Sequence, residues 1–264
     1  MLQTISVGIV GVGGLGSHVA QQLAYLGVRK FALIDGDVVS DSNLNRMIGA
    51  NFSDIGNRKV DVIERVIKAI DANAIISRVP DSFITNSGFE ILASSDFVFG
   101  CLDHDGPRFV LNEYCQAYEK RYMDLATEIH EEQRAFGGRA FYSTGGEMCL
   151  VCKDLLRDEE IRDAFATEEQ RREDRRIYGL SAAATLGSGG AVVTLNGVIA
   201  SLGVTEFMLE VTGIREARQS LEYNGMMGIV TIDRDAPKPD CYYCKGIRGR
   251  KDDSGVRRYL QTTG

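Results

Sequence analysis

Three glycines follow a short apolar run near the start of the chain. Gly11, Gly13 and Gly16 fit the pattern GxGxxG, directly after residues 5–10. Glycine lets the backbone approach a phosphate closely, and the N-terminus of a following helix favours the phosphate's negative charge. The pattern therefore predicts a nucleotide-phosphate site, with Gly14 in the same turn. A tight structural turn without a ligand is the alternative.

Acidic and basic side chains follow the ends of the predicted strands. Asp35 comes 19 residues after Gly16, where an acid hydrogen-bonds a ribose hydroxyl in dinucleotide-binding folds. Cations at this edge suit a triphosphate, and a strand-end aspartate such as Asp103 suits a magnesium ion, which accepts few protein ligands. For each basic residue the alternative is an ordinary solvated position. The further candidates are Asp37, Asn43, Arg46, Arg58, Lys59 and Arg108.

Four of the six cysteines form two CxxC pairs. Four thiolates are the donor set of a tetrahedral zinc site, and four protein ligands leave no open position, so the predicted role is structural. The long separation between the pairs leaves disulfides, inert thiols or a dithiol redox motif as alternatives. The other two thiols, Cys101 and Cys115, are expected to be small core residues. The predicted zinc ligands are Cys149, Cys152, Cys241 and Cys244.

These side chains can meet only in a fold that brings the ends of several strands to one edge of a sheet. Short apolar runs alternate with helical patterns, which predicts an α/β fold: a Rossmann-like, doubly wound, mostly parallel sheet covered on both faces. A zinc-stapled C-terminal part completes it. The predicted strands are 5–10, 30–34, 74–79, 96–101, 122–126 and 228–233. The predicted helices are one after the glycine loop and those over 58–70, 89–93, 107–118 and 191–211.

Length and composition set the organisation and exclude some functions. The 264 residues suit one domain over 1–245, with a charged crossover segment at 153–190 and a tail at 246–264 that is expected to fray. A net charge of −7 argues against nucleic-acid or membrane-surface partners. No long apolar span and no secretory signal are visible, so the expected compartment is the cytoplasm.

The ordered series of motifs resembles the ThiF/MoeB-like adenylyltransferases, the superfamily that includes the ubiquitin-activating enzymes. The series consists of GVGGLGS at 11–17, DGDVVSDSNLNR at 35–46, the helix-opening Lys59 and CLDHDGPR at 101–108, and the resemblance spans roughly 5–245. It implies adenylation of a carboxylate with ATP and magnesium. The usual substrate is the C-terminal glycine of a ubiquitin-like protein.

The resemblance also implies a role for each matched residue. The two CxxC pairs fall where these enzymes carry structural zinc. Arg46, Lys59 and Asp103 are expected to carry catalysis, because a carboxylate attacks the α-phosphate only when anionic repulsion is cancelled and the groups are aligned. No general base is needed, since the nucleophile is already ionised. Asp35 would hold the ribose, Asn43, Arg46 and Lys59 the phosphates and Asp103 the magnesium, while Arg108 would support the site.

The chain departs from the family pattern in the crossover. Many relatives form a thioester on a cysteine there, but residues 153–240 contain no cysteine. We therefore predict adenylation without that thioester. A hydroxyl of Ser181, Thr185 or Ser188 is an alternative acyl acceptor, although an unactivated hydroxyl is a poor nucleophile. A Gly/Ser-rich turn before a helix is the preferred interpretation of that segment.

The chain also begins at the first strand, whereas relatives such as MoeB place before it a helical segment whose arginine reaches the partner subunit's ATP. Either that arginine is missing, or another part of the chain supplies it, or the chain is one domain of a larger assembly. The resemblance implies a homodimer. Three alternatives to the leading function remain: adenylation of a peptide, amino acid or tRNA-linked carboxylate or carbamoyl group, a nicotinamide-dependent oxidoreductase, and an inactive adaptor for a ubiquitin-like protein. Arg46 and Asp103 argue against the last two, since neither hydride transfer nor scaffolding needs them.

Overall fold

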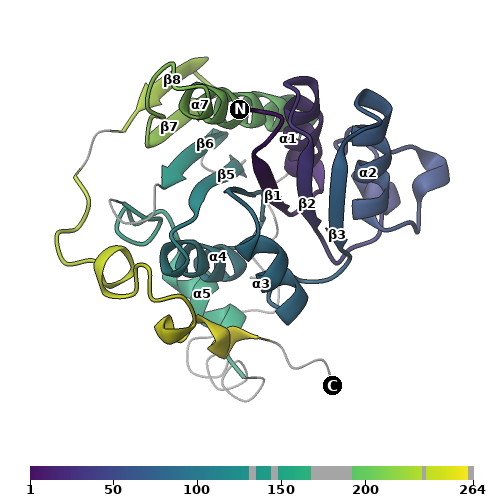
Figure 1. Ribbon diagram of the computed structural model, residues 1–264. Coiled ribbons are helices and arrows are strands. Elements are labelled where there is room, and N and C mark those ends of the chain that lie inside the picture. Colours follow the sequence, from purple (N-terminus) through teal and green to yellow (C-terminus); the bar gives the residue numbers. More distant parts are fainter. Residues whose placement is uncertain (131–134, 144–147, 168–191, 234–235, 261–264) are drawn as a thin grey trace.

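A mixed sheet forms the centre of the molecule in the computed structural model, which describes residues 1–264 except 131–134, 144–147, 168–191, 234–235 and 261–264. Among the described residues, eight strands pair in the order β3-β2-β1-β4-β5-β6-β7-β8 (Figure 1). The strands are β1 (Ser6–Val10), β2 (Lys30–Ile34), β3 (Ile75–Val79), β4 (Phe97–Gly100), β5 (Arg121–His130), β6 (Ala135–Ser143), β7 (Ser220–Asn224) and β8 (Ile229–Ile232).

The sheet has a parallel half and an antiparallel half. Strands β3, β2, β1, β4 and β5 pair in parallel, and β5 to β8 pair antiparallel. The predicted Rossmann-like α/β fold is confirmed. Strands β6 and β7 were absent from the sequence prediction, because β6 holds Gly137 and Gly138. A Cβ on Gly138 would lie 2.3 Å from the carbonyl oxygen of Ala126, so glycine is needed for a strand contact that only the fold creates.

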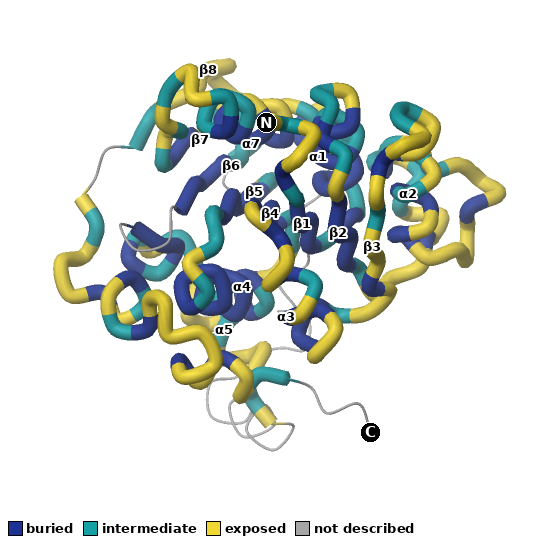
Figure 2. Tube along the Cα trace, viewed as in Figure 1, coloured by how far each residue is buried: buried dark blue, intermediate teal, exposed yellow. Residues whose placement is uncertain are grey.

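Helices cover both faces of the sheet, and their apolar sides form two core clusters. Figure 2 shows the central strands buried between these layers. Helices α1 (Gly14–Tyr25), α2 (Lys59–Ile70) and α7 (Val193–Val211) lie on one face, and α3 (Asn86–Ala93) and α4 (Asp105–Ala117) lie on the other, with α5 (Asp158–Phe165) against α4.

The C-terminal residues 246–260 pack against the domain, so the expectation of a frayed tail was wrong for them. Ile247 and Val256 are fully buried in the cluster beneath α4. Two nitrogens of Arg258 bind the two carboxylate oxygens of Glu113 at 2.7 and 2.8 Å. The sequence prediction missed this contact because Glu113 is distant in the chain. Short helical turns are η1 (Asp41–Asn43), η2 (Phe52–Asp54), η3 (Tyr242–Gly246), η4 (Lys251–Ser254) and η5 (Val256–Tyr259).

The chain direction creates a crevice between β1 and β4. After β1 the chain runs outward to β2 and β3, and it then returns to β4 on the other side of β1. In open α/β sheets, ligands bind outside the carboxyl ends of the strands at such a switch point. Gly100 at the end of β4 pairs with Asp124, so residues 125–130 of β5 extend past that edge and form one side of the crevice.

None of the helices in the described part of the chain is long and apolar enough to cross a membrane.

Candidate active site

A cleft of about 1050 Å³ opens at the switch point over the carboxyl ends of β1, β2 and β4. All the nucleotide-site residues predicted from the sequence line it except Gly16 and Arg58. The fold thus gathers side chains that are spread over a hundred positions of the sequence. The predicted residues at the cleft are Gly11, Gly13, Gly14, Asp35, Asp37, Asn43, Arg46, Lys59, Asp103 and Arg108.

The glycines of the loop divide into two roles. Gly11 has a φ of 84°, and a Cβ there would lie 2.6 Å from the carbonyl oxygen of Cys101. A Cβ on Gly16 would lie 1.9 Å from the carbonyl oxygen of Gly11, so both glycines are needed for the turn and the packing of α1. A Cβ on Gly13 would meet only Nζ of Lys59, at 3.8 Å. Gly13 is therefore the position where the backbone is open to a ligand.

Asp35 is held rigidly at the carboxyl end of β2. One carboxylate oxygen accepts a hydrogen bond from the backbone N–H of Val12 at 2.8 Å, and the other accepts from the backbone N–H of Asp37 at 2.9 Å. Burial raises the pKa of Asp35 above its ordinary value. Each oxygen keeps a further lone pair, which suits a ribose hydroxyl.

Two cations flank the glycine loop. Lys59 is the first residue of α2, and its ammonium binds the carboxylate of Asp37 at 2.7 Å. The Cγ of Arg46 lies 3.1 Å from the point where a Gly14 Cβ would stand. The Arg46 guanidinium donates to the side-chain oxygen of Asn45 at 3.1 Å and to a backbone carbonyl. Arg46 donates only to neutral oxygens among the described residues, and the carboxylate that binds Lys59 is exposed to solvent. The positive charge of both side chains is therefore available to an anion in the cleft.

The side chains of Asn43 and Arg58 both make hydrogen bonds to the backbone, but only Asn43 lines the cleft. The side-chain oxygen of Asn43 accepts from the backbone N–H of Ser40 at 3.0 Å, so Asn43 stabilises the turn that carries Arg46. Arg58 donates to the carbonyl oxygen of Gly36 at 2.7 Å and does not line the cleft. The expectation that Arg58 belongs to the site was wrong, because its side chain ties the loop after β2 to α2.

Asp103 follows β4 and stands free at the rim of the cleft. Its side chain is 71% exposed, and Nε2 of His104 lies 3.9 Å from one of its carboxylate oxygens. Magnesium keeps several waters and takes one or two carboxylates, so an exposed carboxylate in the cleft that Lys59 and Arg46 also line fits this ion.

A buried polar network forms the floor of the cleft. Arg108 donates to the carbonyl oxygen of Leu102 at 2.9 Å and lies near Asp105 and Asp124, at 3.5 and 3.8 Å. Burial by itself would lower the pKa of Arg108, but the two carboxylates outweigh it and the net shift is upward. Arg108 thus supports the floor, as expected. Arg139 of β6 binds Asp124 at 3.5 Å and was missed, because β6 had not been predicted.

The remaining thiols and histidines near the site have different surroundings. Cys115 is fully buried, as predicted, but Cys101 is half-buried and lines the cleft. Cys101 packs against the core, as expected, but it is also accessible from the crevice, because it directly follows the end of β4. Burial raises the pKa of its thiol, which weakens it as a nucleophile. His18, in the first turns of α1, lies beside Gly197 of α7.

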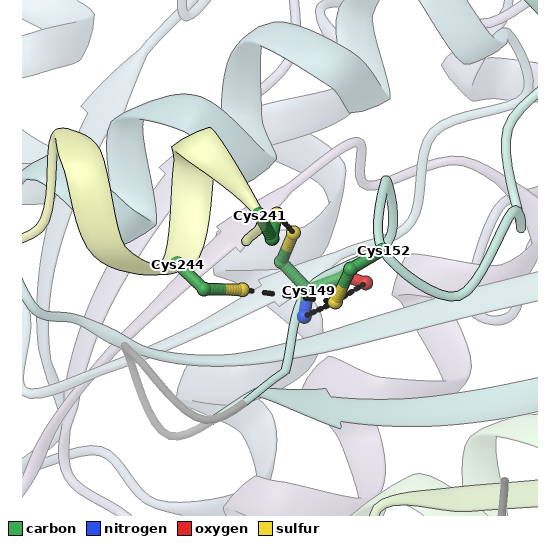
Figure 3. Close-up of side chains that lie close together, drawn as sticks. All are labelled: Cys149, Cys152, Cys241 and Cys244. Carbon is green, nitrogen blue, oxygen red and sulfur yellow. Dashed lines mark hydrogen bonds between the residues drawn. The ribbon is translucent and has the colours of Figure 1, made fainter. Parts of the chain in front are cut away.

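The four CxxC cysteines do not line the cleft and meet between η3 and the loop after β6 (Figure 3). Their sulfur atoms all lie within 4.8 Å of one another, and the sulfurs of Cys149 and Cys241 are 3.7 Å apart, as are those of Cys152 and Cys244. A disulfide needs about 2.05 Å. Sulfurs at about 2.3 Å from a central zinc would stand about 3.8 Å apart, so the spacing fits a tetrahedral metal site.

Hydrogen bonds within the cluster favour the thiolate form of one ligand. The backbone N–H of Cys149 donates to the sulfur of Cys152 at 3.1 Å. Hydrogen bonds from the thiols of Cys149 and Cys244 lower the pKa of Cys152. The thiolate is the form that binds a metal ion.

The crossover is described only in its first part. All residues of helix α5 are exposed or half-buried, and Glu160 on this helix accepts from the backbone N–H of Asp105 at 3.2 Å. The proposed ester acceptors Ser181, Thr185 and Ser188 lie outside the described residues.

The family profile described as ThiF family matches residues 1–243, and the chain therefore belongs to the ThiF family. Among curated relatives, it is 24% identical over 256 residues to "Ubiquitin-like modifier-activating enzyme 5" of Arabidopsis thaliana, covering 91% of this chain and 55% of that protein. It is 31% identical over 114 residues to "Adenylyltransferase and sulfurtransferase UBA4" of Candida albicans, covering 43% of this chain and 26% of that protein.

The fold is also found among solved structures. The chain superposes on "Crystal structure of E. coli MccB + ATP" with a TM-score of 0.73 and 19% identity, over 92% of this chain and 67% of that one. The chain spans about half or less of the length of the two curated relatives.

Proposed function

We propose that this protein adenylates the C-terminal carboxylate of a ubiquitin-like protein, with ATP and magnesium as co-substrate and cofactor. The observation that carries the proposal is the gathering of Asp35, Lys59, Arg46 and Asp103 around one cleft at the switch point of a ThiF-family fold. The printed names of the two curated relatives, a ubiquitin-like modifier-activating enzyme and an adenylyltransferase, support the same class of reaction.

The proposed step joins two anions. A carboxylate oxygen attacks the α-phosphorus, the bond from that phosphorus to the bridging oxygen of pyrophosphate breaks, and an acyl adenylate and pyrophosphate result. Lys59 and Arg46 would hold the phosphates and reduce the repulsion between the anions. Asp103 would hold magnesium, which stabilises the charge on the departing pyrophosphate. Positioning of this kind can contribute about 7–11 kcal/mol to lowering a barrier.

The adenylate would form without a thioester on the crossover. The sequence places no cysteine in residues 153–240, and the cleft thiol of Cys101 has a raised pKa. Zinc is proposed for the four-cysteine cluster, where it would staple η3 to the loop after β6. A homodimer or a larger assembly in the cytoplasm, where thiols stay reduced, is the proposed setting.

The experiment is ATP–pyrophosphate exchange with a panel of ubiquitin-like proteins that end in glycine. We expect exchange that needs both the partner and magnesium and that is lost when the partner's terminal glycine is deleted. Asp103→Asn should lower the rate about 100-fold or more through loss of the magnesium ligand. Asp253→Asn, which changes an exposed aspartate of η4 outside the cleft, is the control and should leave the rate unchanged.

Other outcomes would redirect the proposal. Exchange supported only by short peptides, amino acids or a tRNA-linked group would replace the substrate class, and hydride transfer to a nicotinamide without exchange would overturn adenylation. A second experiment tests the linkage. After the reaction, denaturing gels should show no adduct between this protein and the ubiquitin-like protein that dithiothreitol removes. A dithiothreitol-labile adduct on Cys101 or Cys115 would contradict the absence of a thioester, and an adduct that only hydroxylamine removes would indicate an ester.

A further inference from the structure

Asn196 is a polar side chain in the first turn of α7 that its surroundings leave incomplete. It is 1% exposed, and its Nδ2 has no hydrogen-bond partner among the described residues. The other atom of the amide, Oδ1, accepts from the hydroxyl of Thr127 on β5 at 3.5 Å. Buried donors are nearly always paired, so an unpaired one requires an explanation.

The free amide nitrogen faces the glycine loop. Asn196 lines the cleft, and its Nδ2 lies 2.6 Å from the point where a Gly14 Cβ would stand. The side chain of Arg46 approaches the same point at 3.1 Å, and Nζ of Lys59 approaches the corresponding point at Gly13 at 3.8 Å. The Asn196 amide and the side chains of Arg46 and Lys59 therefore approach the same two residues of the glycine loop, Gly13 and Gly14.

Asn196 belongs to the first turn of helix α7. Asn196 lies three residues after Val193, where the 19-residue helix begins. The N–H groups of a helix's first turn carry a partial positive charge, which favours an anion there. The amide of Asn196 therefore reaches the glycine loop from the start of a helix that comes much later in the chain.

Asn112 shows that burial alone does not create this arrangement. It is fully buried on α4, and its Nδ2 also has no partner among the described residues. Its Oδ1 accepts from the backbone N–H of Leu150 at 3.0 Å, and Asn112 does not line the cleft. Asn112 is therefore a matched comparison of the same residue type and burial without access to a ligand.

We propose that Asn196 is a further binding residue, whose Nδ2 donates a hydrogen bond to a phosphoryl oxygen of the bound nucleotide beside Arg46 and Lys59. The inference rests on the proposed function, because it takes the cleft as the ATP site. A phosphoryl oxygen is the acceptor of choice at this point, since hydrogen bonds to an anion are about twice as strong as those between neutral groups.

The test is calorimetric binding of magnesium–ATP, of its α,β-methylene analogue and of adenosine, without any acyl substrate. Asn196→Ala should weaken binding of both nucleotides about 10-fold through loss of one charge-assisted hydrogen bond. Asn196→Asp should weaken it further, about 100-fold, because a carboxylate repels the phosphate. Adenosine, which lacks phosphates, should bind all variants equally. Asn112→Ala should lower the Tm and leave nucleotide affinity unchanged.

The outcomes separate this inference from the proposed function. Wild-type protein that binds no ATP would overturn both. ATP binding that is equal in wild type and both Asn196 variants would overturn the inference and leave the proposed function standing. Equal weakening of ATP and adenosine would also overturn it, because a general distortion of the site would then explain the loss. Unchanged Tm values for Asn196→Ala exclude misfolding as the cause.

Discussion

The cleft and the cysteine-stapled region use polar side chains in opposite ways. At the cleft, the side chain of Asp103 is 71% exposed, and Nδ2 of Asn196 has no hydrogen-bond acceptor among the described residues. In the stapled region, Glu113 is fully buried and accepts from both Arg258 nitrogens and from the hydroxyl of Tyr259. Asp103 and Asn196 therefore keep polar atoms available to a ligand, whereas the carboxylate of Glu113 is used up in holding the C-terminal residues.

This difference predicts which substitutions should reduce stability and which should reduce binding or rate. A change in the stapled region removes interactions that exist in the free protein and should therefore reduce its stability. A change at Asp103 or Asn196 removes interactions that exist only with a ligand, and it should leave the free protein intact while reducing binding or rate.

The largest expected effect follows from removing one thiol of the cluster. Cys149→Ser takes away one of four ligands, and the protein should lose its zinc and much of its stability, because structural zinc sites contribute on the order of 10 kcal/mol to folding. Metal analysis and thermal unfolding measure both quantities. Cys115→Ala, which changes a buried thiol outside the cluster, should keep its metal. Full zinc content in Cys149→Ser would refute the assignment.

The next effect concerns the ion pair that fixes the C-terminal residues. Arg258→Met leaves the buried carboxylate of Glu113 without its guanidinium, and the free energy of unfolding should fall by about 3 kcal/mol. Urea denaturation measures this loss. The double variant Glu113→Gln with Arg258→Met should recover part of it, since no buried charge remains. An unchanged midpoint in the single variant would show that the tail contributes nothing to stability.

Two glycines of one loop should separate stability from binding. Gly16→Ala places a Cβ 1.9 Å from the carbonyl oxygen of Gly11 and should lower stability by about 1–3 kcal/mol or more. Gly13→Ala meets only the Lys59 ammonium, so it should fold normally yet bind ATP about 10-fold or more weakly. Thermal unfolding and calorimetry on the same samples check both. Equal losses of stability in the two variants would contradict the division of roles.

The smallest effect is a change in how stability depends on pH. The side-chain hydrogen bonds from Arg65 lower the pKa of the buried Asp54 below its ordinary value of 3.8. The stability from this pair is present above that value and is lost as the pH falls through the folded pKa. Asp54→Asn should therefore make stability fall less steeply between about pH 5 and pH 2, as measured by urea unfolding at each pH.

The pKa of the cleft carboxylate Asp35 is shifted in the opposite direction to that of Asp54. Burial raises its pKa, so its ionisation lowers stability as the pH rises from 3.8 through the folded value. Asp35→Asn should remove that decline, opposite to the change in Asp54→Asn. The same direction of change in both variants would show that the two carboxylates do not differ as the structure indicates.

The parallel half of the fold was predictable because its signals are local. The β1–α1–β2 unit follows from an apolar run, a glycine loop and helical spacing within some thirty residues, and β2 occupies the predicted bounds. The antiparallel half was not predictable to the same degree. Strand β6 carries two glycines and β7 is short, so only their pairing with β5 and with each other defines them as strands.

The sequence by itself determined the types of chemistry: a glycine loop, strand-end charges and four thiolates whose identity and local spacing are written in consecutive residues. Only the tertiary structure decided which of them meet. It joined cysteines 92 positions apart, placed Cys101 and Arg139 at the cleft, excluded Arg58, and brought Asn196 of α7 to the loop before α1. The physical reason is that such contacts depend on strand order and helix packing across the whole chain, which no short window of sequence encodes.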